Sequence, residues 1–147
     1  MRRVLSVVVV FSLLFSLTMV MNTAPALANS TTYYVDSING NDNNSGTSEA
    51  TAWRTLEKVN SMVFQPGDRI LFKRGCTWTG QLVLRGSGTS SNPIRVDMYG
   101  TSGSKPKIIG TGLGTNDMSD PSKAANVAAV YLHNVDYWEI RNLEVTN

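Results

Sequence analysis

The sequence has few of the residues on which most catalytic and metal sites depend. It contains one cysteine and one histidine, and its formal net charge is only +2. A single cysteine, Cys76, cannot form an internal disulfide. No histidine stands at a recognisable spacing from it, and His133 has no serine or cysteine motif beside it, so neither residue indicates nucleophilic catalysis. No glycine-rich loop follows a strand and opens a helix, which leaves nucleotide binding without support.

A basic start followed by an apolar run opens the chain. Two arginines precede the largely apolar segment 4–21, and the small residues Ala26 and Ala28 follow it in an Ala-x-Ala pattern. This arrangement predicts a secretory signal peptide over residues 1–28, although the 18 residues of this segment could nearly span a bilayer as an anchor. Cleavage would leave a secreted, extracellular protein without a membrane segment.

The signal peptide accounts for the excess of positive charge. Removing Arg2 and Arg3 lowers the 13 lysines and arginines to 11, which equals the 11 aspartates and glutamates. The remaining chain of 147 less 28, or 119, residues is therefore formally neutral. Since binding to phosphate backbones needs a net or clustered positive surface, a nucleic-acid partner is excluded.

One short helix is expected near the start of the mature chain. The β-branched and aromatic segment 31–36 predicts a strand. The apolar positions Ala52, Leu56, Val59 and Val63 are then spaced four, three and four residues apart, which is a helical stripe. Thr55 is the predicted N-cap of this helix, and the Pro-Gly pair at 66–67 ends the segment in a turn.

The rest of the chain has the pattern of short strands separated by turn residues. The predicted strands are 69–73, 81–85, 94–99, 107–109, 129–134, 137–142 and 143–147. Regular short strands indicate a sandwich, a barrel or a solenoid. The connections near 134–136 and 142 lack the Asn-Gly or Asp-Gly pairs of tight hairpins, which favours the solenoid. Asn134, Asn142 and Asn147 fall at its expected corners, where asparagine tolerates a left-handed backbone.

Several stretches resemble the start of known secreted proteins. These are "YYVDSINGNDNNSGTSEATAWRTLEKVN", "FQPGDRILFKRG", "GTSSNPIRVDMYGTSGSKPKIIG" and "AVYLHNVDYWEIRNLEVTN". Over about residues 33–147 the chain is similar to secreted right-handed parallel β-helix proteins of the pectate-lyase-like superfamily, which includes polysaccharide lyases and glycoside hydrolases. The resemblance implies an all-β fold, a right-handed parallel β-helix with a short N-terminal capping helix. Residues 29–65 would form the strand, loop and capping helix, and residues 66–147 the first coils.

The loop at 39–47 is rich in side-chain oxygen atoms, which are the ligands of calcium sites. An EF-hand loop needs oxygen ligands at positions 1, 3 and 5, glycine at 6 and glutamate at 12. A loop starting at Asn41 places Asn43, Ser45 and Gly46 in register, but position 12 is Ala52. The sequence therefore predicts a surface turn and no metal or cofactor in this part of the chain. Calcium would be expected only in a longer lyase, as the resemblance implies.

Neither the carboxylates nor the aromatic residues form a recognisable catalytic motif. Asp97, Asp136, Glu139 and Glu144 lie on predicted strands or bends and are expected to face solvent. The aromatic candidates for stacking on sugar are Trp78, Tyr99, Tyr131, Tyr137 and Trp138. Strand alternation places Trp138 with Ile140 on one face, so Tyr137 on the other face is the predicted substrate-binding residue.

Two functions are compatible with these observations. The first is the front part of a secreted polysaccharide-degrading enzyme, since the strand pattern continues to Asn147 without a closing cap. As the resemblance implies, its reaction would be calcium-assisted β-elimination on an acidic plant or algal polymer, with hydrolysis by paired carboxylates as the alternative. The second is a non-catalytic extracellular carbohydrate-binding or cell-surface β-helix module. A fold of this kind does not by itself decide between them.

Overall fold

The computed structural model describes residues 30–111 and 128–146, and these residues are mostly strand. Within these ranges one α-helix and one 3-10 turn accompany nine short strands. The elements are β1 (Thr32–Val35), η1 (Glu49–Thr51), α1 (Leu56–Asn60), β2 (Arg69–Lys73), β3 (Thr77–Thr79), β4 (Leu82–Leu84), β5 (Ile94–Tyr99), β6 (Lys107–Ile109), β7 (Val130–Leu132), β8 (Trp138–Ile140) and β9 (Glu144–Thr146). The expected all-β class is confirmed.

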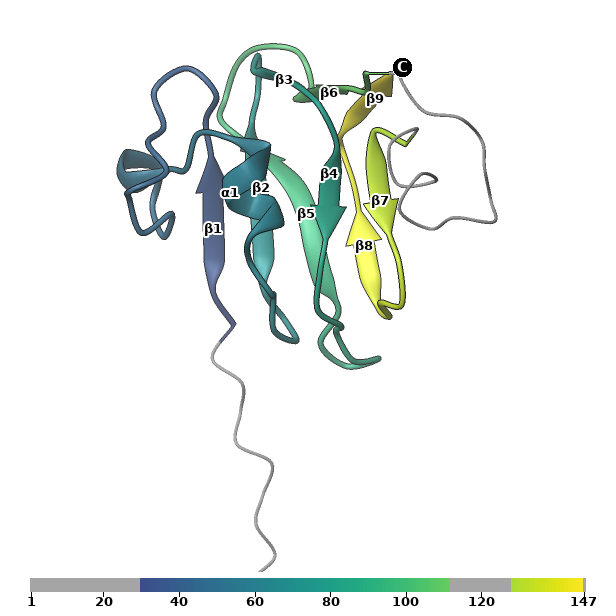
Figure 1. Ribbon diagram of the computed structural model, residues 1–147. Coiled ribbons are helices and arrows are strands. Elements are labelled where there is room, and N and C mark those ends of the chain that lie inside the picture. Colours follow the sequence, from purple (N-terminus) through teal and green to yellow (C-terminus); the bar gives the residue numbers. More distant parts are fainter. Residues whose placement is uncertain (1–29, 112–127, 147) are drawn as a thin grey trace, which may run out of the picture.

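The strands form three sheets whose pairings are all parallel. Sheet A has the order β1-β2-β5-β8, sheet B the order β3-β6-β9, and sheet C pairs β4 with β7. From β2 onward the chain visits A, B and C in turn and then begins again, so neighbours in a sheet are three strands apart in sequence. The strands of sheet A accordingly run side by side across the molecule (Figure 1). This topology excludes a row of antiparallel hairpins in the described part of the chain.

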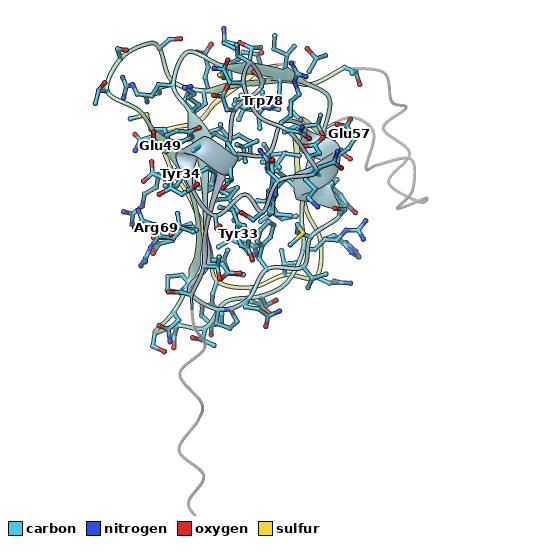
Figure 2. All side chains as sticks on the ribbon, turned by 90° about the vertical axis from the view of Figure 1, so that its left-hand side faces the viewer. Tyr33, Tyr34, Glu49, Glu57, Arg69 and Trp78 are labelled. Carbon is cyan, nitrogen blue, oxygen red and sulfur yellow. The ribbon has the colours of Figure 1, made fainter. Side chains whose placement is uncertain are left out.

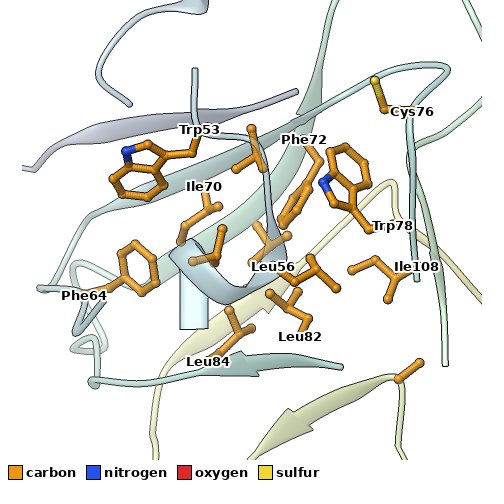
Figure 3. Packing of buried hydrophobic residues seen from close by; sticks show 14 of the residues in the cluster. Trp53, Leu56, Phe64, Ile70, Phe72, Cys76, Trp78, Leu82, Leu84 and Ile108 are labelled. Carbon is orange, nitrogen blue, oxygen red and sulfur yellow. The ribbon is translucent and has the colours of Figure 1, made fainter. Parts of the chain in front are cut away.

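Apolar side chains from the three sheets meet in one core. Because side chains alternate along a strand, Ile70 and Phe72 of β2 share the inner face of sheet A with Ile94 and Val96 of β5. Sheet B contributes Trp78 and Ile108, and the ring of Trp78 meets Phe72 edge-on at 5.0 Å between ring centroids. Leu82 supplies part of the face from sheet C. Figure 3 shows these residues gathered around α1.

Helix α1 confirms the predicted start but is shorter than the apolar stripe. The side chain of Thr55 accepts a hydrogen bond from the amide of Lys58, as an N-cap does. Leu56 and Val59 are buried, but Val63 is 61 % exposed. The prediction for Val63 was wrong because the helix ends at Asn60, so helical spacing no longer governs the position three residues later.

The segment before β2 covers two strand edges with hydrogen bonds. The Asn60 side chain donates from Nδ2 to the carbonyl of Gln81 at 2.9 Å, and its Oδ1 accepts from the amide of Val83 at 2.7 Å. The side chain of Asn60 thus hydrogen-bonds to the backbone groups at the edge of β4, as a neighbouring strand would. At β1, Trp53 donates its backbone amide to Tyr34 and accepts from Asp36. Unpaired edges favour association, so these contacts protect two of them.

The remaining strand predictions differ mainly at β3 and at the corners. Strand β3, which has a single apolar residue between two threonines, was not predicted. Asn134 and Asn142 adopt the expected left-handed backbone, with φ of 52° and 54°, and Tyr137 does so too. The predicted signal peptide and the corner at Asn147 lie outside the described residues. Within those residues, no helix is long and apolar enough to span a membrane.

Candidate functional site

A buried carboxylate organises the end of β1. The side chain of Asp36 accepts hydrogen bonds from the backbone amides of Ile38 and Asn39, and its Oδ2 lies 2.6 Å from Nζ of Lys73. The thiol of Cys76 lies 3.5 Å from Oδ1. Burial acts to raise the pKa of Asp36, but the hydrogen bonds from Lys73, the two amides and Cys76 outweigh it and lower the pKa to about 2. Asp36 is therefore a structural anion, and Cys76 is a buried free cysteine.

Asp42 holds the turn that leads into α1. Its Oδ1 accepts from the amides of Arg54 at 2.7 Å and Thr55 at 3.0 Å, and its Oδ2 accepts from the Thr55 hydroxyl at 2.8 Å. Partial burial acts to raise the pKa of Asp42, yet these hydrogen bonds lower it below its ordinary value. The one acidic side chain of the 39–47 loop is thus engaged by protein donors, which supports a structural interpretation of the loop.

We expect Asp42→Ala to lower the free energy of unfolding by about 1 to 3 kcal/mol, because it leaves two amides without their acceptor. The neighbouring exposed Asn43 provides the control, since Asn43→Ala should change stability by less than about 1 kcal/mol. Urea unfolding measures both. Added calcium should leave the melting temperature of the wild-type chain unchanged. A stabilisation by micromolar calcium that disappears in Asp42→Ala would contradict this interpretation.

Ion pairs between strands occupy the outer face of sheet A. Glu139 lies 2.8 Å from Nε of Arg95 on the neighbouring strand and 2.9 Å from the guanidinium of Arg141. The hydrogen bond from Arg95 lowers the pKa of Glu139, with a further contribution from Arg141. A general acid in glycoside hydrolysis needs a raised pKa. Glu139 is therefore suited to joining strands and not to donating a proton.

The other three predicted carboxylates are also on the surface or in strand-joining contacts. Oδ1 of Asp97 accepts from the side-chain amide of Asn142 at 2.9 Å. Glu144 lies 2.6 Å from Nζ of Lys107 in the adjacent strand of sheet B. Asp136 is exposed at the turn before β8. The contacts of Asp97 and Glu144 join neighbouring coils of the chain, and none of the three carboxylates lies in a pair arranged for catalysis.

The remaining candidate ligands do not converge. His133 is exposed, and its ring stacks on Tyr131 with 6.0 Å between ring centroids. Within residues 30–111 and 128–146, no group of three or more histidine, cysteine, aspartate or glutamate side chains is placed to hold a metal ion. The described surface thus contains polar contacts that join strands and turns, without a recognisable catalytic cluster.

The aromatic candidates divide into buried and exposed residues. Trp78 and Tyr99 are buried, and Trp138 is partly buried against the core. Tyr137 is 55 % exposed, as predicted, but it lies at the corner before β8 and not in the predicted strand. Figure 2, seen from the β1 side, shows the two faces of sheet A. Tyr33 lies on the inner face, whereas Tyr34 and Arg69 lie on the outer face.

Sequence comparison places glycosidases among the similar proteins. No family model matches the chain. The chain is 32 % identical over 139 residues to a lacto-N-biosidase of Bifidobacterium longum, covering 85 % of this chain and 9 % of that protein. It is 28 % identical over 142 residues to an α-1,3-galactosidase A of Akkermansia muciniphila, covering 86 % of this chain and 24 % of that protein. The chain therefore spans less than a quarter of the length of either of these relatives.

Structural comparison agrees with the sequence. The GH136 lacto-N-biosidase from Eubacterium ramulus superposes with a TM-score of 0.67 and 35 % identity, covering 80 % of this chain and 20 % of that one. A second structure of the same enzyme gives a TM-score of 0.63 and 33 % identity. The expected relation to carbohydrate-active enzymes with a β-rich fold is confirmed at this level. The chain is thus similar, in sequence and in fold, to a part of glycoside hydrolases of the lacto-N-biosidase type.

Proposed function

We propose that the chain is the N-terminal part of a secreted glycoside hydrolase built on a right-handed parallel β-helix. The observation that carries the fold is the repeated visit to sheets A, B and C, always with parallel pairing. Each circuit from β2 to β5 and from β5 to β8 would be one coil of a solenoid. In this proposal, the signal peptide expected at residues 1–28 directs the protein to secretion.

The two ends of the stack differ, which supports a role as its beginning. On the β1 side, Trp53 and Asn60 satisfy the edges of β1 and β4. On the other side, β7, β8 and β9 each have a strand partner on one side only within the described residues. Leu132, Ile140 and Val145 are exposed on these same strands. Further coils stacked there would bury these side chains and pair the edges.

The reaction we propose is hydrolysis of a glycosidic bond. The relatives named lacto-N-biosidase and α-1,3-galactosidase favour it over the β-elimination that the sequence suggested. The substrate would be a glycan carrying lacto-N-biose or α-1,3-linked galactose, and not an acidic plant or algal polymer. Since none of the candidates Asp97, Asp136, Glu139 and Glu144 belongs to a pair of carboxylates arranged for catalysis, we place the catalytic acid and base in further coils of the complete protein.

The gene beyond codon 147 provides the test. We expect genomic sequence to continue in frame, and the product to release sugar from lacto-N-bioside or α-1,3-galactoside substrates while the 147-residue chain alone releases none. Neither protein should form unsaturated product from pectate or alginate with calcium. A stop codon directly after codon 147 would contradict the proposal. A continuing frame whose purified product binds these glycans without cleaving them would favour the non-catalytic carbohydrate-binding module instead.

A further inference from the structure

The corner before β8 has a residue that its backbone does not favour. Three described residues other than glycine have a positive φ, namely Asn134 at 52°, Asn142 at 54° and Tyr137 at 56°. Asparagine tolerates this left-handed conformation, whereas a bulky aromatic residue is uncommon there and is strained. The chain thus uses asparagine at two corners and tyrosine at the third, although the backbone angles of all three are nearly equal.

Core packing does not explain the tyrosine either. The side chain of Tyr137 is 55 % exposed. The next residue, Trp138, is the one that reaches the core: its Nε1 donates to the carbonyl of Gly86 at 2.9 Å, and its ring meets Phe64 edge-on at 5.9 Å. A strained residue whose side chain the core does not use is a candidate for a functional role.

The turn between β4 and β5 holds this corner in place. The amide of Gly88 donates to the carbonyl of Asp136 at 2.9 Å, and the amide of Asp136 donates to the hydroxyl of Ser87 at 3.0 Å. The carbonyl of Tyr137 accepts from the amide of Ile94 at 3.0 Å. A Cβ at Gly88 would lie 2.7 Å from the Tyr137 carbonyl oxygen, so only glycine permits this approach. Both turns lie at the same end of the strands (Figure 1). The ring is therefore presented on a fixed backbone.

The turn that holds this corner carries short polar side chains. Thr89, Ser91 and Asn92 are exposed in the same turn, where the hydroxyl of Ser91 lies within hydrogen-bond distance of both neighbours' side chains. An aromatic face next to hydroxyl and amide groups suits a pyranose ring, whose C–H face packs on the aromatic ring while its hydroxyls exchange hydrogen bonds. A pre-formed backbone lowers the ordering cost of such a contact.

We propose that Tyr137 and the adjoining turn 87–92 form a sugar-binding subsite for one neutral hexose or N-acetylhexosamine residue of the glycan. This assignment rests on the proposed function for its ligand class. The ring of Tyr137 supplies the stacking surface, and the hydroxyl and amide side chains of the turn supply orientation.

Saturation-transfer NMR and calorimetry with N-acetyllactosamine and α-1,3-galactobiose test the subsite on the full 147-residue chain. Tyr137→Asn keeps a residue that accepts the left-handed backbone and should weaken binding about tenfold or more. Its melting temperature should equal or exceed that of the wild type, because the strain is relieved. Tyr137→Phe should bind as the wild type does. Ile38→Asn, which removes a comparably exposed apolar side chain elsewhere, should also leave binding unchanged.

Two results would overturn the subsite. One is wild-type affinity in Tyr137→Asn, and the other is the absence of binding of either sugar to the wild-type chain. A Tyr137→Asn substitution that lowers the stability of the longer gene product without changing glycan affinity would also overturn it, since the ring would then be packing against further protein. None of these outcomes affects the hydrolysis assay on the longer product, so the subsite and the proposed reaction fail separately.

Discussion

Leu56→Asp is expected to abolish the cooperative thermal unfolding transition of the chain. Leu56 is 3 % exposed and packs from α1 against the side chains of β4 (Figure 3). The substitution removes that packing and places a carboxylate in the core without a partner. Losing a buried leucine side chain alone costs about 2 to 5 kcal/mol, and a buried charge adds several more. Domains of this size are stable by only about 5 to 15 kcal/mol, so the variant should be largely unfolded.

Val63→Asp is the matched control for this experiment. It introduces the same side chain into the same apolar stripe of the sequence, but the position is 61 % exposed. We expect its melting curve, followed by circular dichroism, to stay close to that of the wild type. Light scattering should show aggregation for Leu56→Asp alone. If the Leu56 variant melts cooperatively at the wild-type temperature, α1 does not contribute to the core as described.

The contrast between these positions explains what the sequence could predict. Strands β2, β5 and β6 match the predicted ranges because two or more apolar residues lie between clear turn signals. Strand β3 has only Trp78 as an apolar residue, too short a pattern to detect alternation. Val63 was misplaced because periodicity indicates a helix without locating its end. That end depends on Asn60, whose side chain bonds to β4 more than 20 residues later in the sequence.

The candidate site was harder to predict than the fold, because it too depends on contacts between residues far apart in the sequence. The exposure of Tyr137 was predicted from strand alternation, but the residue lies outside β8, at a corner whose left-handed backbone is hydrogen-bonded to the turn between β4 and β5. The importance of Asp36 depends on Lys73, 37 residues away, and on Cys76, 40 residues away. Asp36 ends the predicted strand 31–36, and nothing near it in the sequence marks it as buried. Only the parallel pairing of β1 with β2 reveals it as a buried anion.

Asp36 makes the stability of the chain depend on acid pH. Its folded-state pKa of about 2 lies below the ordinary value of 3.8, so folding favours the ionised form. The stabilisation is complete above the ordinary value and is lost as the pH falls through the folded-state pKa. The difference between the two pKa values corresponds to about 2 kcal/mol. Since the side chain of Asp36 is only 3 % exposed, solvent screening reduces this little.

Asp36→Asn removes the titrating group while keeping nearly the same shape. At pH 7 we expect it to lower the free energy of unfolding by about 2 kcal/mol, because the ammonium of Lys73 loses its carboxylate partner. Guanidinium unfolding at a series of pH values should show the wild type and the variant converging between about pH 5 and pH 2. Lys73→Met should also lower stability at pH 7, since it leaves the Asp36 carboxylate with its amide donors but without the opposite charge.

Glu139→Gln tests whether the pH dependence of stability comes from Asp36 in particular or from the protonation of carboxylates in general. Glu139 also has a lowered pKa, but its ion pairs with Arg95 and Arg141 lie on the outer face of sheet A, where solvent weakens them. Its substitution should therefore change the pH profile much less than Asp36→Asn does. If the wild type and Asp36→Asn differ by the same amount at pH 7 and pH 2, the carboxylate contributes through shape and hydrogen bonding alone. In that case the charges of the Asp36–Lys73 ion pair do not contribute to holding the end of β1 against β2.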